Sequence, residues 1–152
     1  MSDTKIITMK TVADFEKMEI AGAAVAAVHV AVREAAAPGV SMKELDAISA
    51  AILKERKCTP SFLGYHGFPA TICASPNSTI VHGIPDDYRL REGDIVSIDA
   101  GAIYEGWHGD AAPCDTEKLV PNRRSVGVRA KADDRQHREL LQIPQTHPHL
   151  HI

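Results

Sequence analysis

The stretch EGDIVSIDAGAIYEGWHGDAA, residues 92–112, alternates apolar with small or polar side chains on both sides of the dipeptide Glu105-Gly106. Alternation with a period of two is typical of a β-strand, and a two-residue segment that ends in glycine is typical of a tight hairpin turn. We therefore predict a strand over residues 94–104, a turn at Glu105-Gly106 and a second, antiparallel strand over residues 107–112.

The predicted hairpin brings two carboxylates to one face of its strands. In this register Asp110 lies opposite Gly101, one diagonal step from Asp99. Diagonal neighbours on two strands sit roughly 7–8 Å apart at the backbone, so their carboxylates can converge on shared metal ions. We interpret Gly101 as keeping space open for such ions. Two solvated acids on an exposed strand face fit the same geometry, and short acidic motifs often match by accident.

Neighbouring carboxylates repel each other unless a proton or a cation compensates their charge. A pair of divalent ions about 3.5–4 Å apart would do so, and would also activate a water molecule as a nucleophile. His108 falls on the Asp99 face in the same register, which leaves a metal-facing role open for it. His82 and His66 can donate hydrogen bonds to a substrate. Taken by themselves, both are more simply interpreted as ordinary surface or core histidines.

Two amphipathic helices are predicted before the hairpin. Thr11 and Asp14 suit the start of the first helix, whose apolar stripe ends before Pro38. Residues 41–44 form a capping box that begins the second helix. Two short β-prone segments follow, at residues 71–75 and 79–82, and the second ends at His82. Helices followed by antiparallel strands indicate the α+β class.

Composition is that of a globular protein, with 44% apolar and 24% charged residues. The net charge of −3 favours neither a nucleic acid nor an anionic membrane as a partner. The longest apolar run, residues 21–32, is too short to cross a bilayer, and residues 1–10 do not resemble a secretory signal. We expect a cytoplasmic protein in which Cys58, Cys73 and Cys114 are free thiols.

These segments, in this order, resemble type I methionine aminopeptidases. The matching stretches are residues 39–45, LGYHGFP at 63–69, VHGIP at 81–85 and the hairpin at 92–112, together with the helix near residues 17–22. The resemblance implies a pita-bread fold within the α+β class, with antiparallel strands packed on helices. It also implies a hydrolase that removes the initiator methionine from nascent polypeptides, with the ribosome as a further partner.

The resemblance also implies roles for individual residues. Asp99 and Asp110 would be ligands of two divalent ions, such as Co, Mn or Fe, and Asp110 would bridge both. His82 would contact the substrate and help to stabilise the transition state. A pocket for the methionine side chain would be lined by Tyr65, Phe68 and Cys73, and His66 in the same LGYHGFP run is a further substrate-binding candidate. Aromatic and cysteine side chains on short strands are otherwise ordinary core residues.

The match ends near Pro113, and only 12 of the 40 residues from there to Ile152 are apolar. We therefore predict that residues 1–112 are the N-terminal half of a methionine aminopeptidase-like domain and that residues 113–152 are a divergent, poorly ordered tail. The family needs a further His and two Glu as metal ligands, and a second substrate-contacting His, none of which a segment here matches. The chain is thus expected to be truncated, with its activity open.

Two other functions remain open from the sequence. One is a catalytically dead pita-bread remnant that acts as a binding module, at the ribosome or with a full-length partner. The other is a related hydrolase such as a proline-specific dipeptidase, although the joint presence of LGYHGFP and VHGIP argues against it.

Overall fold

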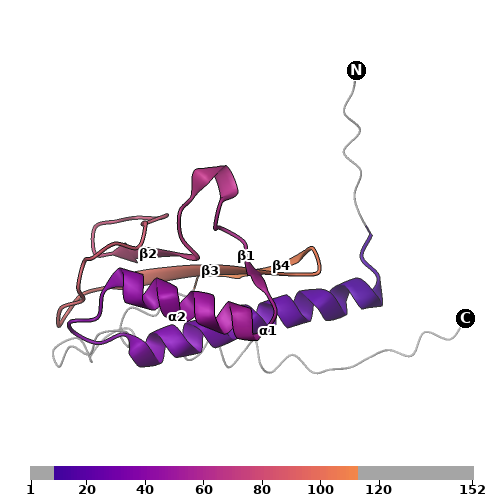
Figure 1. Cartoon of the computed structure of the whole chain (residues 1–152), viewed down its shortest axis with the longest axis horizontal. Helices are drawn as coiled ribbons and strands as arrows, with labels where there is room; N and C mark the ends of the chain where they lie inside the picture. Colours follow the sequence, from indigo (N-terminus) through magenta and orange to yellow (C-terminus); the bar gives the residue numbers. More distant parts are fainter. Residues whose placement is uncertain (1–8, 113–152) are drawn as a thin grey trace, which may run out of the picture. The chain divides into compact units, whose positions relative to one another are not determined.

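A computed structural model of the chain describes residues 9–112 (Figure 1). Two helices cover one face of an antiparallel sheet, and the loop that contains η1 rises from the opposite face. The elements in chain order are α1 Val12–Ala35, α2 Met42–Glu55, β1 Thr59–Pro60, the 3₁₀ turn η1 Tyr65–Gly67, β2 Ile72–Pro76, β3 Val96–Tyr104 and β4 Trp107–Ala111. The predicted α+β class is confirmed; the tail predicted at residues 113–152 lies outside the described residues.

Both helices begin where the sequence predicts. The Thr11 side chain accepts a hydrogen bond from the Asp14 N–H, and the Asp14 carboxylate accepts one from the Thr11 N–H. Ser41 and Glu44 form the same reciprocal box at the start of α2. Each box satisfies backbone donors that the first turn of a helix leaves without a partner, which is why these ends follow from local sequence alone.

The core lies between the helices and the inner face of β3. Alternate residues of β3 from Val96 to Ala102 are buried against the apolar stripes of α1 and α2. The Asp46 carboxylate of α2 accepts hydrogen bonds from the N–H groups of Thr71 and Ile72, at 2.8 and 3.0 Å. These bonds fix the beginning of β2 to α2, so the sheet is anchored to the helical layer by polar as well as apolar contacts.

The β3–β4 hairpin has the predicted register. Glu105 and Gly106 both have positive φ, 46° and 84°, which is the backbone of a two-residue type I′ turn. Tyr104 pairs with Trp107, and Gly101 pairs with Asp110. β1 and β2 pair with one edge of β3, and β4 pairs with the opposite edge of β3.

Two predicted segments differ from the structure. Residues 79–82 form no strand; Asn77, with φ of 52°, turns the chain out of the sheet, and Ile80 and Val81 are exposed. Their β-branched side chains favour a strand only when another strand lies beside them. β3 also begins at Val96 rather than at residue 94, because the Asp94 carboxylate accepts the Arg91 N–H and closes a turn.

Within residues 9–112, no helix is long and apolar enough to cross a membrane. Cys58 and Cys73 are both free and buried, as predicted. Cys114 lies outside the described residues.

A close contact between α1 and β4 depends on Gly109. A Cβ placed on Gly109 would come within 2.5 Å of the Gly22 backbone nitrogen, whereas a Cβ placed on Gly22 would meet nothing within 4 Å. Gly109 therefore allows the strand to lie directly on the helix backbone. Gly109 thus faces the backbone of α1 at Gly22, whereas a side chain on Gly22 would enter open space.

We predict opposite effects of alanine at these two positions. Gly109→Ala should lower the free energy of unfolding by about 1–3 kcal/mol, because the new methyl group overpacks a backbone contact. Gly22→Ala should raise it by about 0.5–1 kcal/mol, because alanine is the better helix former and has room. Urea denaturation followed by circular dichroism measures both. Equal effects of the same sign would contradict the contact.

Candidate metal centre

Asp99 and Asp110 lie on the face of the sheet that points away from the helices. On β3, Asp99 alternates with the buried residues Ile98 and Ala100, so its side chain leaves the opposite face. Asp110 pairs with Gly101 on β4, one diagonal step from Asp99. The convergence predicted from the sequence is therefore present in the backbone register.

The Asp99 side chain is only partly exposed, and one of its carboxylate oxygens lacks a hydrogen-bond donor among the described residues. Its Oδ1 atom is buried and has no hydrogen-bond partner among the described residues. Burial raises the pKa of the Asp99 carboxyl above its ordinary value, the Asp110 carboxylate raises this pKa further, and His82 lowers it. A buried carboxylate oxygen without a donor is costly in a folded protein. A bound cation would remove that cost, so the donor chemistry here fits a divalent metal.

Cys73 lies on β2, directly opposite Asp99 of β3. The two residues form a pair in the β2–β3 ladder, and the Cys73 thiol is buried. Burial raises the pKa of this thiol to about 11, and the Asp99 and Asp110 carboxylates contribute to the rise. Cys73 is therefore a neutral, soft side chain at the edge of the carboxylate pair, which is compatible with a wall of a pocket for a thioether.

His82 was predicted to end a strand, but no strand forms there; its charge nevertheless acts on the Asp99 carboxyl. It sits in a loop with a left-handed backbone, φ 55°, and is exposed. The next residue attaches this loop to β2: the Gly83 N–H donates to the Ser75 hydroxyl at 3.0 Å, and the Gly83 carbonyl accepts from Ala74 N–H at 2.9 Å. A side chain at position 83 would collide with the Ala74 carbonyl, so glycine is needed to bring His82 to this edge.

The space above Gly101 is filled, contrary to the interpretation from the sequence. A Cβ on Gly101 would approach the Ser61 side chain at 2.8 Å and the Phe62 ring at 3.0 Å. The glycine thus admits residues of the segment after β1, not ions. Ser61 and Phe62 were missed as neighbours of the site; the glycine opposite Asp110 was the signal, because an in-strand glycine often marks a close approach.

His108 lies on the Asp99 face, as the register predicts. It pairs with Ile103, is exposed, and its Nδ1 is 3.1 Å from the Ser61 hydroxyl. A hydrogen bond to one ring nitrogen orients the imidazole and leaves Nε2 for another partner. His108 therefore shares a sheet face with the two carboxylates and lies on the same strand as Asp110, but the three side chains do not form one group.

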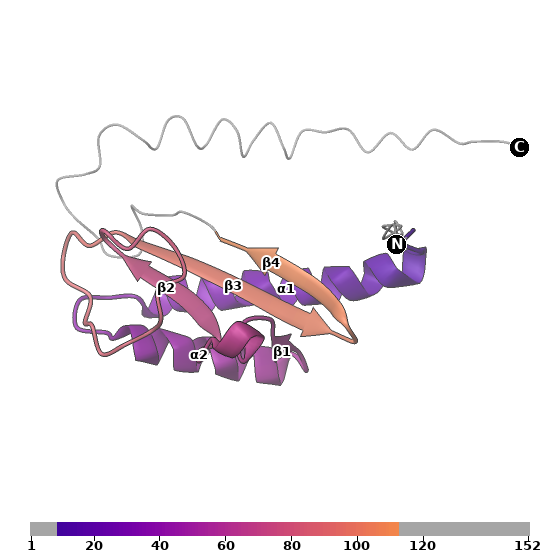
Figure 2. The ribbon, with the colours of Figure 1, turned by 90° about the horizontal axis from the view of Figure 1, so that it is seen from above.

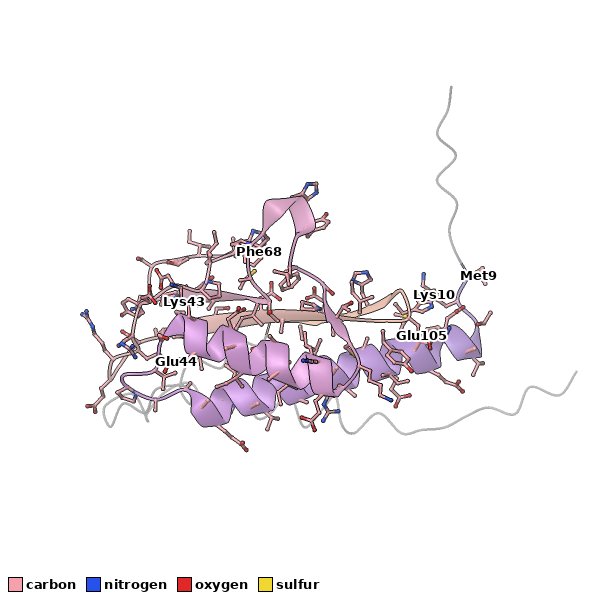
Figure 3. The ribbon with its side chains drawn as sticks, viewed as in Figure 1. Met9, Lys10, Lys43, Glu44, Phe68 and Glu105 are labelled. Carbon is pink, nitrogen blue, oxygen red and sulfur yellow. The ribbon has the colours of Figure 1, made fainter. Side chains whose placement is uncertain are left out.

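The LGYHGFP segment forms the raised loop around η1. Tyr65 and His66 are exposed, and their rings meet edge to face at 4.3 Å. Phe68 is half-buried and lies on the sheet side that points away from the helices (Figure 3). The structure therefore brings Phe68 and Cys73 to the carboxylate face, while Tyr65 and His66 stand out at the tip of the loop.

Within residues 9–112, no three His, Cys, Asp or Glu side chains form a group that could hold a metal ion. Two carboxylates supply fewer ligands than a divalent ion takes, which is at least four. The described residues therefore provide part of a metal site, with the correct donor type and an unsatisfied oxygen.

Comparison with known proteins identifies the family of the chain. The pattern of Metallopeptidase family M24 matches residues 16–113, and the chain belongs to this family. It is 51% identical over 109 residues to methionine aminopeptidase 1 of Mycobacterium tuberculosis, covering 71% of this chain and 41% of that protein. It is 45% identical to methionine aminopeptidase 1 of Bacillus subtilis, over 70% of this chain and 43% of that protein.

A solved structure shows the same arrangement. The methionine aminopeptidase of Thermotoga maritima superposes with a TM-score of 0.69 at 41% identity, covering 70% of this chain and 43% of that chain. The fold is therefore pita-bread, as predicted. The chain spans about two fifths of the length of the relatives that it matches.

The raised pKa of Asp99 predicts a pH-dependent stability. Below the ordinary value of 3.8 the carboxyl is protonated in both states, and as pH rises through the higher folded pKa the folded state must ionise a partly buried group. This group therefore destabilises the metal-free fold at neutral pH. Asp99→Asn should be more stable than the parent at pH 7 with a chelator present, and this advantage should disappear towards pH 3.

Urea denaturation across this pH range measures the effect. Asp87→Asn is a matched control, because Asp87 is an exposed carboxylate paired with Lys43. An advantage of Asp99→Asn that does not change with pH would show that ionisation of Asp99 is not its cause.

Proposed function

We propose that this chain is the N-terminal half of a methionine aminopeptidase, and that it contributes Asp99 and Asp110 as ligands of two divalent ions. The observation that carries the proposal is the β3–β4 register, which pairs Gly101 with Asp110 beside Asp99 and its unsatisfied Oδ1. Membership of family M24 and similarity to proteins named methionine aminopeptidase support the same reaction class. The substrates are peptides and nascent chains with an N-terminal methionine. The protein encounters them in the cytoplasm and at the ribosome.

The chemistry divides between the cations and the protein. Divalent ions at this site would supply positive charge that acidifies the attacking water and polarises the peptide carbonyl. Asp99 and Asp110 would bind these ions and thereby fix their position on the sheet. His82 contributes a hydrogen bond to the substrate near the reacting carbonyl, from a loop that Gly83 fixes to β2.

The substrate pocket in this proposal is built from β2 and the η1 loop. Phe68 and Cys73 provide the apolar wall, and the neutral Cys73 thiol is compatible with a thioether side chain. Tyr65 and His66 form the rim, where their exposed rings can contact an entering peptide.

The alternative function is a binding module that holds methionine-bearing N-termini without cleaving them. Its support is that residues 9–112 bring together only part of a ligand set. A proline-specific peptidase is separated from the lead proposal by its preference for Xaa-Pro peptides.

We predict that the purified full chain releases methionine from a Met-Ala peptide in the presence of Mn²⁺ or Co²⁺, and that a chelator stops the release. Asp110→Ala should abolish turnover, because it removes one carboxylate of the pair. Asp87→Ala should retain the activity of the parent, because Asp87 pairs with Lys43 on the surface. The measurement is free methionine by a coupled assay, with an Ala-Pro peptide as the specificity control.

Equal turnover by Asp110→Ala and the parent would contradict the assignment of the carboxylate pair. Binding of Met-Ala without cleavage, by a protein shown to be folded by circular dichroism, would replace the enzyme with the binding module.

A further inference from the structure

β4 forms an edge of the described sheet. It pairs with β3 along one side, whereas β1 and β2 pair with the other side of β3. Figure 2 shows β4 at the margin of the ribbon, with β3, β2 and β1 all to one side of it. Among residues 9–112, no strand pairs with the outer side of β4. The open N–H and C=O groups of an edge strand are a template for another strand.

The hairpin turn determines which backbone groups of β4 face outward. Tyr104 and Trp107 flank the two-residue turn and close it as a hydrogen-bonded pair. Hydrogen-bonded and non-hydrogen-bonded pairs alternate along an antiparallel ladder, so the pairs that contain His108 and Asp110 are non-hydrogen-bonded. The N–H and C=O groups of His108 and Asp110 therefore point away from β3.

A second copy of the same strand satisfies these groups by symmetry. If two β4 strands run antiparallel and are centred on Gly109, the His108 backbone of one copy lies opposite the Asp110 backbone of the other, twice. Directly opposed residues have their Cβ atoms about 4.5–5.5 Å apart, within reach of an imidazole and a carboxylate. Because the outward groups are those of His108 and Asp110, this register pairs all of them.

The same register would add a donor to the carboxylate pair. His108 and Asp110 share the face that carries Asp99, so the partner's His108 would lie beside Asp110 on that face. One copy alone does not gather three donors within residues 9–112, and Asp99 Oδ1 has no hydrogen-bond partner there. The bond between Ser61 and His108 Nδ1 leaves Nε2 as the ring nitrogen available to a cation.

We propose that the chain associates with a second copy through β4, in a twofold dimer in which His108 of each copy completes the cation site of Asp99 and Asp110 in the other. The use of His108 as a ligand rests on the proposed function, whereas the strand pairing does not. Two strands of five residues bury little surface, so the dimer is weak without a cation. A cation that binds only the dimer strengthens it by mass action.

The test is the molar mass of the full chain by sedimentation velocity, over a range of protein concentrations, with Mn²⁺ and then with EDTA. We expect a monomer–dimer equilibrium that Mn²⁺ shifts towards dimer and EDTA reverses. A monomer at all concentrations with Mn²⁺ present would overturn the proposal.

A matched pair of variants locates the interface. His108→Glu places a carboxylate opposite Asp110 twice and should leave only monomer, whereas His108→Lys places an ammonium there and should dimerise in EDTA as well. Circular dichroism checks that both variants fold, and His66→Ala is the control for loss of an imidazole elsewhere. A dimer that His108→Glu leaves unchanged would overturn the β4 interface. A Mn²⁺-dependent dimer without release of methionine would contradict the proposed function but not the dimer.

Discussion

The site depends on the pairing of Gly101 with Asp110 across the β3–β4 hairpin. This register places the two carboxylates on the sheet face away from the helices, one diagonal step apart. A shift of one residue would turn Asp110 towards α1, because successive side chains point to opposite faces. The type I′ turn at Glu105 and Gly106, together with the contact of Gly109 with α1, prevents that shift. The conformation of two residues at the turn thus determines whether Asp99 and Asp110 share a face of the sheet.

The two faces of the hairpin have different requirements. On the helix side, Gly109 removes a side chain so that β4 can lie against the backbone of α1. On the other side, Gly101 admits Ser61 and Phe62, and Asp99 keeps a buried oxygen without a partner. Stable packing on one face supports an energetically unfavourable arrangement on the other. That arrangement becomes favourable when positive charge is present, which links the fold to metal-dependent chemistry.

Much of this structure follows from local sequence. The helix start at Thr11, the capping box at Ser41 and the hairpin register were predicted because each depends on neighbours within a few residues. Contacts between distant segments were not predictable in this way. Residues 79–82 have the side chains of a strand but find no pairing partner, and Gly101 was read as open space because the approach of Ser61 is a tertiary contact. The bonds from Asp46 to β2 are of the same kind.

The central claim is that Asp99 and Asp110 hold divalent cations together. The most direct test is a titration of the metal-free full chain with Mn²⁺, in which electron paramagnetic resonance reports the free ion. The parent should bind Mn²⁺, and Asp99→Ala and Asp110→Ala should each lose that binding while circular dichroism shows a folded chain. Equal binding by the parent and by either variant would contradict the account, because the ion would then be held elsewhere in the chain.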